Sequence, residues 1–205
     1  MPNELDWFPR FGEVPGVEYS PLTPVDGKRL PGAGARPERI SDRSGGRFLH
    51  WPTKGGSSSA SPAHERAFGT DFSDMPTAKV LRHLAETLEL PGIPSDYHFA
   101  IQGVLEALWS RRRDEPAVFD MVERLCWLDL GLVRARPDCV SYEADGEVRY
   151  YGLAAFGHLA TLYEREGALR EALDVAELAM HYGQLDARRD DLARRLAALE
   201  AERAG

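Results

Sequence analysis

The chain has 205 residues, 43% of them hydrophobic and 28% charged, which is close to the average composition of soluble globular proteins. Residues 1–70 contain nine of the 25 basic and eight of the 33 acidic residues, which leaves 16 basic and 25 acidic residues, a net charge of −9, for the remainder. A domain this acidic repels phosphate backbones, which counts against nucleic acid as a partner. The first ten residues lack the apolar core of a signal peptide, and no apolar run is long enough to span a bilayer. We therefore expect a cytoplasmic protein without a membrane partner.

Residues 1–72 are expected to form an irregular arm. Nine of the 14 prolines and ten of the 19 glycines fall within residues 1–70, and each proline removes a backbone donor that a helix needs. Aperiodic segments with this content of Pro and Gly are usually disordered or loosely folded. The aromatic clusters Trp7-Phe8 and Phe48–Trp51 are unusual in such a segment. They either pin the arm onto the rest of the protein or serve as motifs for a partner, which makes Trp7 and Trp51 candidate partner-binding residues.

Residues 73–205 are expected to form a helical domain. Apolar residues recur at helical spacing from residue 74 to residue 90, where Leu90-Pro91-Gly92 is a stop signal. A second helix begins at Ser95 or Asp96. A third follows Asp114-Glu115-Pro116 and ends near Gly131 or by Pro137.

The stretch from 140 to 151 breaks the helical pattern. Asp145-Gly146 stands between aromatic and β-branched residues, a combination typical of a two-residue hairpin turn. The sequence predicts a short β-hairpin here, with an irregular loop as the alternative.

The last sixty residues again have helical periodicity. One helix starts at Leu153 and is broken at Gly167, a second is ended by Gly183, and Asp186 caps a third. The arginines of this last helix are mixed with acidic residues on its polar side.

The segment Leu153–Asp186 is 34 residues long and resembles a tetratricopeptide repeat. The matching positions are Leu153, Phe156, Leu159, Tyr163, Gly167, Ala172 and Ala179. It departs from the repeat where Ala160 replaces a glycine, Ala176 a large aromatic residue and Gln184 the closing proline. The pair of helices around residues 97–134 matches more loosely.

The resemblance implies an all-α fold of tetratricopeptide-like helical hairpins with a capping C-terminal helix. It also implies a protein or peptide partner that binds in the groove lined by the first helix of each hairpin. Carried over by position, the candidate groove residues are Ala154, Gly157, Thr161, Glu164 and Arg165. Members of the family that clamp a terminal carboxylate have Lys and Asn where this chain has Gly157 and Thr161, which counts against that mode. The alternative is that the repeat only supports the fold and that the arm fills its groove.

No residue pattern predicts a catalytic, metal or cofactor site. The six histidines include no pair at metal-ligand spacing, and His64-Glu65 lacks the second histidine of a zinc-protease motif. Cys126 is expected to be a small buried hydrophobic residue. The function that we expect is that of an adaptor, assembly factor or regulatory subunit. The first alternative is a small enzyme, or an enzyme subunit, with a site between the arm and the helices, using His50, His64 or Glu65. The second alternative is a nucleic-acid regulator that works through the C-terminal arginines.

Overall fold

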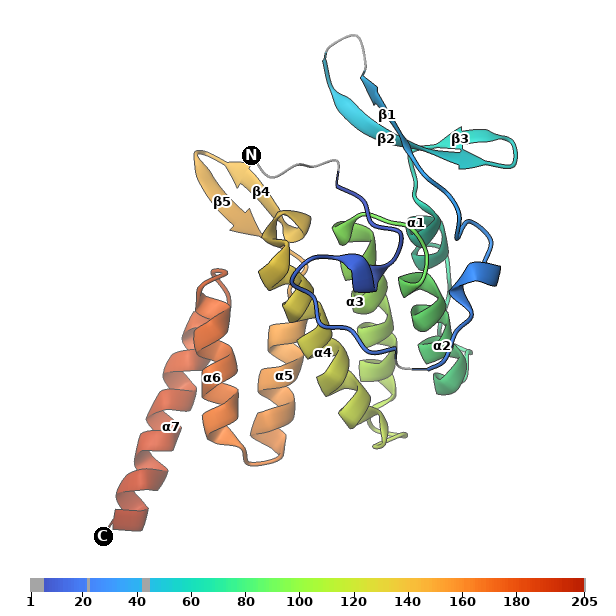
Figure 1. Cartoon of the computed structure of the whole chain (residues 1–205). Helices are drawn as coiled ribbons and strands as arrows, with labels where there is room; N and C mark the ends of the chain where they lie inside the picture. The colour runs from blue at the N-terminus through green and yellow to red at the C-terminus, as the bar shows by residue number, and fades with distance from the viewer. Residues whose placement is uncertain (1–5, 22, 42–44, 205) are drawn as a thin grey trace.

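A computed structural model of the chain describes residues 6–21, 23–41 and 45–204 (Figure 1). These residues form seven α-helices and two small antiparallel sheets, so the protein is mainly α rather than all-α, with one sheet beyond the expected hairpin. The helices are α1 (Pro62–Ala67), α2 (Thr77–Leu88), α3 (Pro94–Arg111), α4 (Val118–Ala135), α5 (Ala154–Arg165), α6 (Leu169–Met180) and α7 (Asp186–Ala204). From α2 to α7 they follow one another in chain order across the molecule.

The predicted β-hairpin is confirmed. Strands β4 (Ser141–Ala144) and β5 (Glu147–Tyr150) pair antiparallel, and Asp145 and Gly146 connect them. Both turn residues have positive φ angles, 56° and 80°, as a type I′ turn requires. The backbone N–H of Tyr151 donates to the carbonyl of Val140 at 3.0 Å and closes the base of the hairpin.

The expectation of an irregular arm is wrong for residues 38–41, 47–53 and 56–58, which form strands, and for residues 62–67, which form α1. Strands β1 (Glu38–Ser41), β2 (Arg47–Thr53) and β3 (Gly56–Ser58) form an antiparallel sheet in the order β1-β2-β3. The sequence does not predict these strands, because the alternation of buried and exposed residues is too short. Along β2 only Leu49 and Trp51 are buried. Residues 1–5, 22 and 42–44 of the predicted arm lie outside the described residues.

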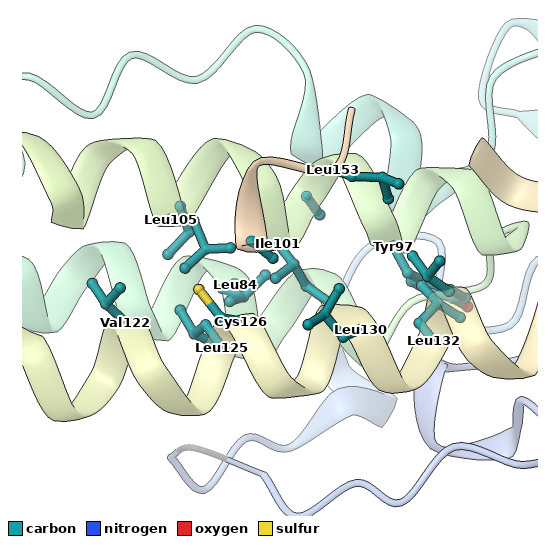
Figure 2. Packing of buried hydrophobic residues seen from close by; sticks show 14 of the residues in the cluster. Leu84, Tyr97, Ile101, Leu105, Val122, Leu125, Cys126, Leu130, Leu132 and Leu153 are labelled. Carbon is teal, nitrogen blue, oxygen red and sulfur yellow. The ribbon is translucent and has the colours of Figure 1, made fainter. Parts of the chain in front are cut away.

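The main core lies between α2, α3, α4 and α5. Figure 2 shows Ile101 and Leu105 of α3 facing Leu125 and Cys126 of α4. These side chains are fully buried. Ile101 and Leu105 are four residues apart, and Leu125 and Cys126 lie three and four residues after the buried Val122, so each set lies on one face of its helix. Cys126 is thus part of the core, as expected from the sequence.

The N-terminal segment belongs to the same core. Phe11 and Val14 are buried in the cluster that contains the helices. The hydroxyl of Tyr97 lies 3.1 Å from the carbonyl of Phe8, and the Phe8 backbone also exchanges two hydrogen bonds with Gly92. The arm is therefore held by the helices rather than loosely attached to them.

Helix α7 packs on α6 through small residues. Ala172 and Ala176 of α6 are fully buried against Leu192 of α7. Since no space remains at these positions, we expect Ala172→Leu to lower the free energy of unfolding by about 1–3 kcal/mol through overpacking. Chemical denaturation measures this change. The matched control is Ala198→Leu, the same substitution at an exposed helical position. Equal stability of the two variants would contradict the packing.

Candidate functional site

The two sheets lie at the same end of the helical bundle, the upper end in Figure 1. Four aromatic rings, which we call the aromatic stripe, extend across this part of the surface: Phe68, Phe99, Tyr151 and Tyr142. Successive ring centroids are 6.1, 6.2 and 5.9 Å apart. Phe68, Tyr151 and Tyr142 expose 46%, 43% and 51% of their surface. The rings thus form a continuous row in which Phe68, Tyr151 and Tyr142 are exposed and Phe99 is partly buried.

Separate elements bring these rings together. Phe68 follows α1, Phe99 lies on α3, Tyr142 lies on β4 and Tyr151 follows β5. Gly152 then turns the chain into α5 with a φ angle of +69°, and a Cβ at this position would lie 3.1 Å from Nε2 of His98. Both the backbone angle and the close approach require glycine here. The sequence offers no signal for this surface, because the four rings have no common period.

A cavity of about 480 Å³ adjoins the stripe, between the β1–β3 sheet and the first turns of α1 and α3. Its apolar walls include Phe48 and Trp51 of β2 together with Phe68 and Phe99. Its polar lining includes Arg47, His64 and Asp96. The cavity is therefore amphipathic, with mostly aromatic walls.

Asp96 organises the polar side of this cavity. One carboxylate oxygen accepts hydrogen bonds from the Ser61 hydroxyl at 2.6 Å and from the backbone N–H of Ile93 at 3.0 Å. The other lies 3.1 Å from Nδ1 of His64. Ser61 also caps α1, because its hydroxyl accepts the backbone N–H of His64. Asp96 thereby joins the starts of two helices and fixes the His64 ring by one nitrogen. His50 and Glu65, the other residues of the enzyme alternative, do not line this cavity.

The predicted groove residues lie on α5, and α7 covers part of their face. Arg188 of α7 donates to the hydroxyl of Thr161 at 2.9 Å and to the carbonyl of Gly157 at 3.4 Å. Arg188 and Arg195 both bind the carboxylate of Glu164. Partial burial raises the pKa of Glu164, but the two arginines together lower it by more than burial raises it. The pKa of Glu164 therefore lies below its ordinary value.

The two ends of this face differ. Ala154 is partly buried at the start of α5, near the aromatic stripe. Arg165 is exposed at the other end, with its guanidinium 5.8 Å from the centre of the Phe119 ring. The structure therefore brings Gly157, Thr161 and Glu164 together under the α7 arginines and leaves Ala154 and Arg165 outside that cluster.

The candidate residues of the arm pack on each other. Trp51 exposes only 2% of its surface, and the Trp7 ring meets it edge to face with 5.7 Å between centroids. Both belong to a small cluster with Leu49 and Ile93 that is separate from the main core. This packing agrees with the interpretation that the aromatic residues pin the arm.

A second hollow of about 910 Å³ lies along the outer face of α4, beside residues 16–20. Trp127, which is 41% exposed, is its most prominent apolar residue. The indole N–H of Trp127 donates to the hydroxyl of Tyr163, which in turn donates to Glu123. Burial and the Glu123 carboxylate raise the pKa of Tyr163. Trp127 and Glu123, which line this hollow, are thus bridged by the hydroxyl of Tyr163.

One polar cluster is fully buried. Nδ1 of His98 lies 2.7 Å from Asp129, and Gln102 donates to the other oxygen of the same carboxylate. Nε2 of His98 makes no hydrogen bond within the described residues. None of the cavities described above reaches this cluster, so it joins α3 to α4 rather than facing a ligand.

The chain has no match among protein-family models, curated proteins or solved structures. Within the described ranges, no three His, Cys, Asp or Glu side chains are grouped so that they could hold a metal ion. In the same residues, no helix is long and apolar enough to cross a membrane. Burial raises the pKa of the Cys139 thiol to about 12 and that of Cys126 even more, which makes both thiols unreactive.

Proposed function

We propose that the protein is a protein–protein interaction module of tetratricopeptide-like helix pairs. It binds a peptide or protein segment along the aromatic stripe and the adjoining end of the α5 groove face. The observation that carries this proposal is the continuous row of rings from Phe68 to Tyr142, of which only Phe99 is partly buried. Exposed aromatic residues in contact with one another are typical of binding surfaces, because they bury a large apolar area on association at a low entropic cost.

The packing of the helices supports the tetratricopeptide-like part of the proposal. The imidazole of His158 on α5 lies 3.2 Å from Glu106 of α3, and its ring contacts that of Trp109, also of α3, at an interplanar angle of 39°. Contact between the first helices of successive pairs is what a groove lined by first helices requires. The small buried residues Ala172 and Ala179 also stand where the repeat brings helices close together.

Substitution within the stripe tests the proposal. We expect Tyr142→Ser and Tyr151→Ser each to weaken binding of the partner by about 30-fold or more, the effect of losing an interface hot spot. The partner is first identified by cross-linking to the full-length protein, and its affinity is then measured for each variant by calorimetry. Point substitutions are preferable to a truncated chain that starts at Ser73, because Phe11 and Val14 belong to the core.

The matched control is Val148→Ser on the same hairpin, where the side chain is 61% exposed but lies outside the row of rings. This variant should bind the partner like the wild type. Equal affinities for all three variants would show that the stripe is not the binding surface.

A second candidate function is the enzyme with a site between the arm and the helices. The observation that favours it is the His64–Asp96 pair at the cavity beside the β1–β3 sheet. A carboxylate that holds one imidazole nitrogen leaves the other available as a general base. The two candidates make different predictions, since His64→Gln would abolish turnover in an enzyme and leave the affinity for a protein partner unchanged.

A further inference from the structure

The cavity between the β1–β3 sheet and the starts of α1 and α3 has the size of a small-molecule site. Its volume of about 480 Å³ falls within the usual range for such sites, about 300–1,000 Å³. Phe48, Trp51, Phe68 and Phe99 supply aromatic walls from β2, from the end of α1 and from α3. A planar apolar group can pack between such walls, because offset or edge-to-face contacts are available on several sides.

The charged group of this cavity that remains available to bind a ligand is positive. The Asp96 carboxylate already accepts hydrogen bonds from Ser61, from the backbone of Ile93 and from His64, so its oxygens are engaged. Arg47 lines the cavity, and its side chain has no ion pair or hydrogen bond among the described residues. Its guanidinium is thus free to bind a carboxylate with two parallel hydrogen bonds.

His64 provides a second polar anchor. Because an ionised carboxylate can only accept, Nδ1 of His64 carries the proton in its contact with Asp96. In the neutral imidazole Nε2 is then an acceptor, so a ligand N–H or O–H can donate to it. The Phe68 ring lies against the imidazole, with 4.3 Å between centroids, and the two side chains form one wall.

We propose that this cavity binds a small aromatic carboxylic acid that carries an N–H or O–H donor. The carboxylate pairs with Arg47, the donor binds His64 Nε2, and the aromatic group packs between Phe48, Phe68 and Phe99. This site goes beyond the proposed function, since a protein partner on Tyr142 and Tyr151 would make use of neither Arg47 nor His64.

The probe for the experiment is N-acetyl-L-phenylalanine, which combines an aromatic ring, a carboxylate and an amide N–H. The readout is the indole N–H resonance of Trp51 in the full-length, ¹⁵N-labelled protein. Trp51 lines the cavity, whereas Trp109 and Trp127 do not, so their resonances serve as internal controls. We expect a saturable shift of the Trp51 signal and none at the other two. A titration without a Trp51 shift would overturn the proposal.

Two comparisons test the role of the charge. N-acetyl-L-phenylalaninamide, which lacks the carboxylate, should bind the wild type at least about tenfold more weakly, because it loses a charge-assisted hydrogen bond. Arg47→Gln should weaken the acid by a similar factor and leave the amide unaffected. Arg39→Gln, an exposed arginine on the neighbouring strand outside the cavity, should change neither affinity. Equal binding of acid and amide by the wild type would refute the carboxylate site.

Discussion

Replacing Asp129 with alanine is expected to lower the free energy of unfolding by about 3–5 kcal/mol, the range for removing one partner of a buried ionic pair. Asp129 and His98 both have no exposed surface. The substitution leaves the Nδ1–H of His98 and the amide of Gln102 without their acceptor in a site that water does not reach. Since the three side chains belong to α3 and α4, the loss falls on the central helix pair. Urea denaturation monitored by circular dichroism measures it.

Asp129→Asn is the matched control, because it keeps the shape and an acceptor oxygen for His98 while it removes the charge. Gln102 can rotate its amide so that its oxygen accepts from the new Asn. We therefore expect this variant to lose much less stability than Asp129→Ala. If the asparagine and alanine variants were equally unstable, the ionised carboxylate rather than the filled hydrogen bonds would be the important feature.

The pH dependence of the same pair has a definite sign. Burial raises the pKa of Asp129, and the contacts with His98 and Gln102 oppose this only in part, so the pKa lies above its ordinary value. The stability that this group contributes is fully present below the ordinary pKa of about 4 and is lost as the pH rises through the raised one. Asp129→Asn removes this titration. The wild type should therefore lose stability relative to Asp129→Asn as the pH rises from about 4 toward neutrality.

Helices α2 to α7 and the β4–β5 hairpin could be predicted because their signals are local, whereas α1 lies within the arm that was expected to be irregular. The Asp145-Gly146 turn, the stop at Leu90-Pro91-Gly92 and the cap at Asp186 depend on a few adjacent residues. The observed elements begin and end within a few residues of these signals. The sheet of β1–β3 has no such signal, because its strands are short and its buried side chains pack on Trp7 and on Ile93, just before α3. Tertiary contacts rather than local preference determine it.

The candidate sites are even harder to predict from the sequence than the β1–β3 sheet. Phe68 and Phe99 are separated by 31 positions and His64 and Asp96 by 32, so neither pair forms a motif along the chain. The sequence indicates Asp96 only as a helix cap, and it does bind the backbone of Ile93, but its contacts with Ser61 and His64 depend on how α1 packs against α3. Local sequence signals predict the role that Asp96 has in its own helix. They cannot predict the role that Asp96 has between helices.

The interpretation of Trp51 can be decided by replacing it with alanine. We expect Trp51→Ala to lower the free energy of unfolding of the β1–β3 sheet by about 3–5 kcal/mol, because a fully buried indole is lost from a small cluster. Since this cluster is separate from the main core, the sheet of β1–β3 should open while α3 and α4 stay folded. Hydrogen exchange measures this directly: amide protection should fall in residues 38–58 and persist in α3 and α4. Trp127→Ala, at a 41% exposed position on α4, should cost less than about 1 kcal/mol and leave the sheet protected.

The two interpretations of the arm then give opposite results. If Trp51 pins the sheet, the variant loses protection in β1–β3 and with it the cavity for the aromatic acid, which Trp51 and Phe48 line. Binding of a protein partner at Tyr142 and Tyr151 would survive, because β4 contacts the short helical turn Pro137–Val140 and Tyr151 contacts Phe99 of α3, neither of which belongs to the sheet. If Trp51 were instead a partner motif, protection would remain unchanged and the partner would be lost. Because the Trp51 side chain is only 2% exposed and the Trp7 ring meets it edge to face, we expect the first result.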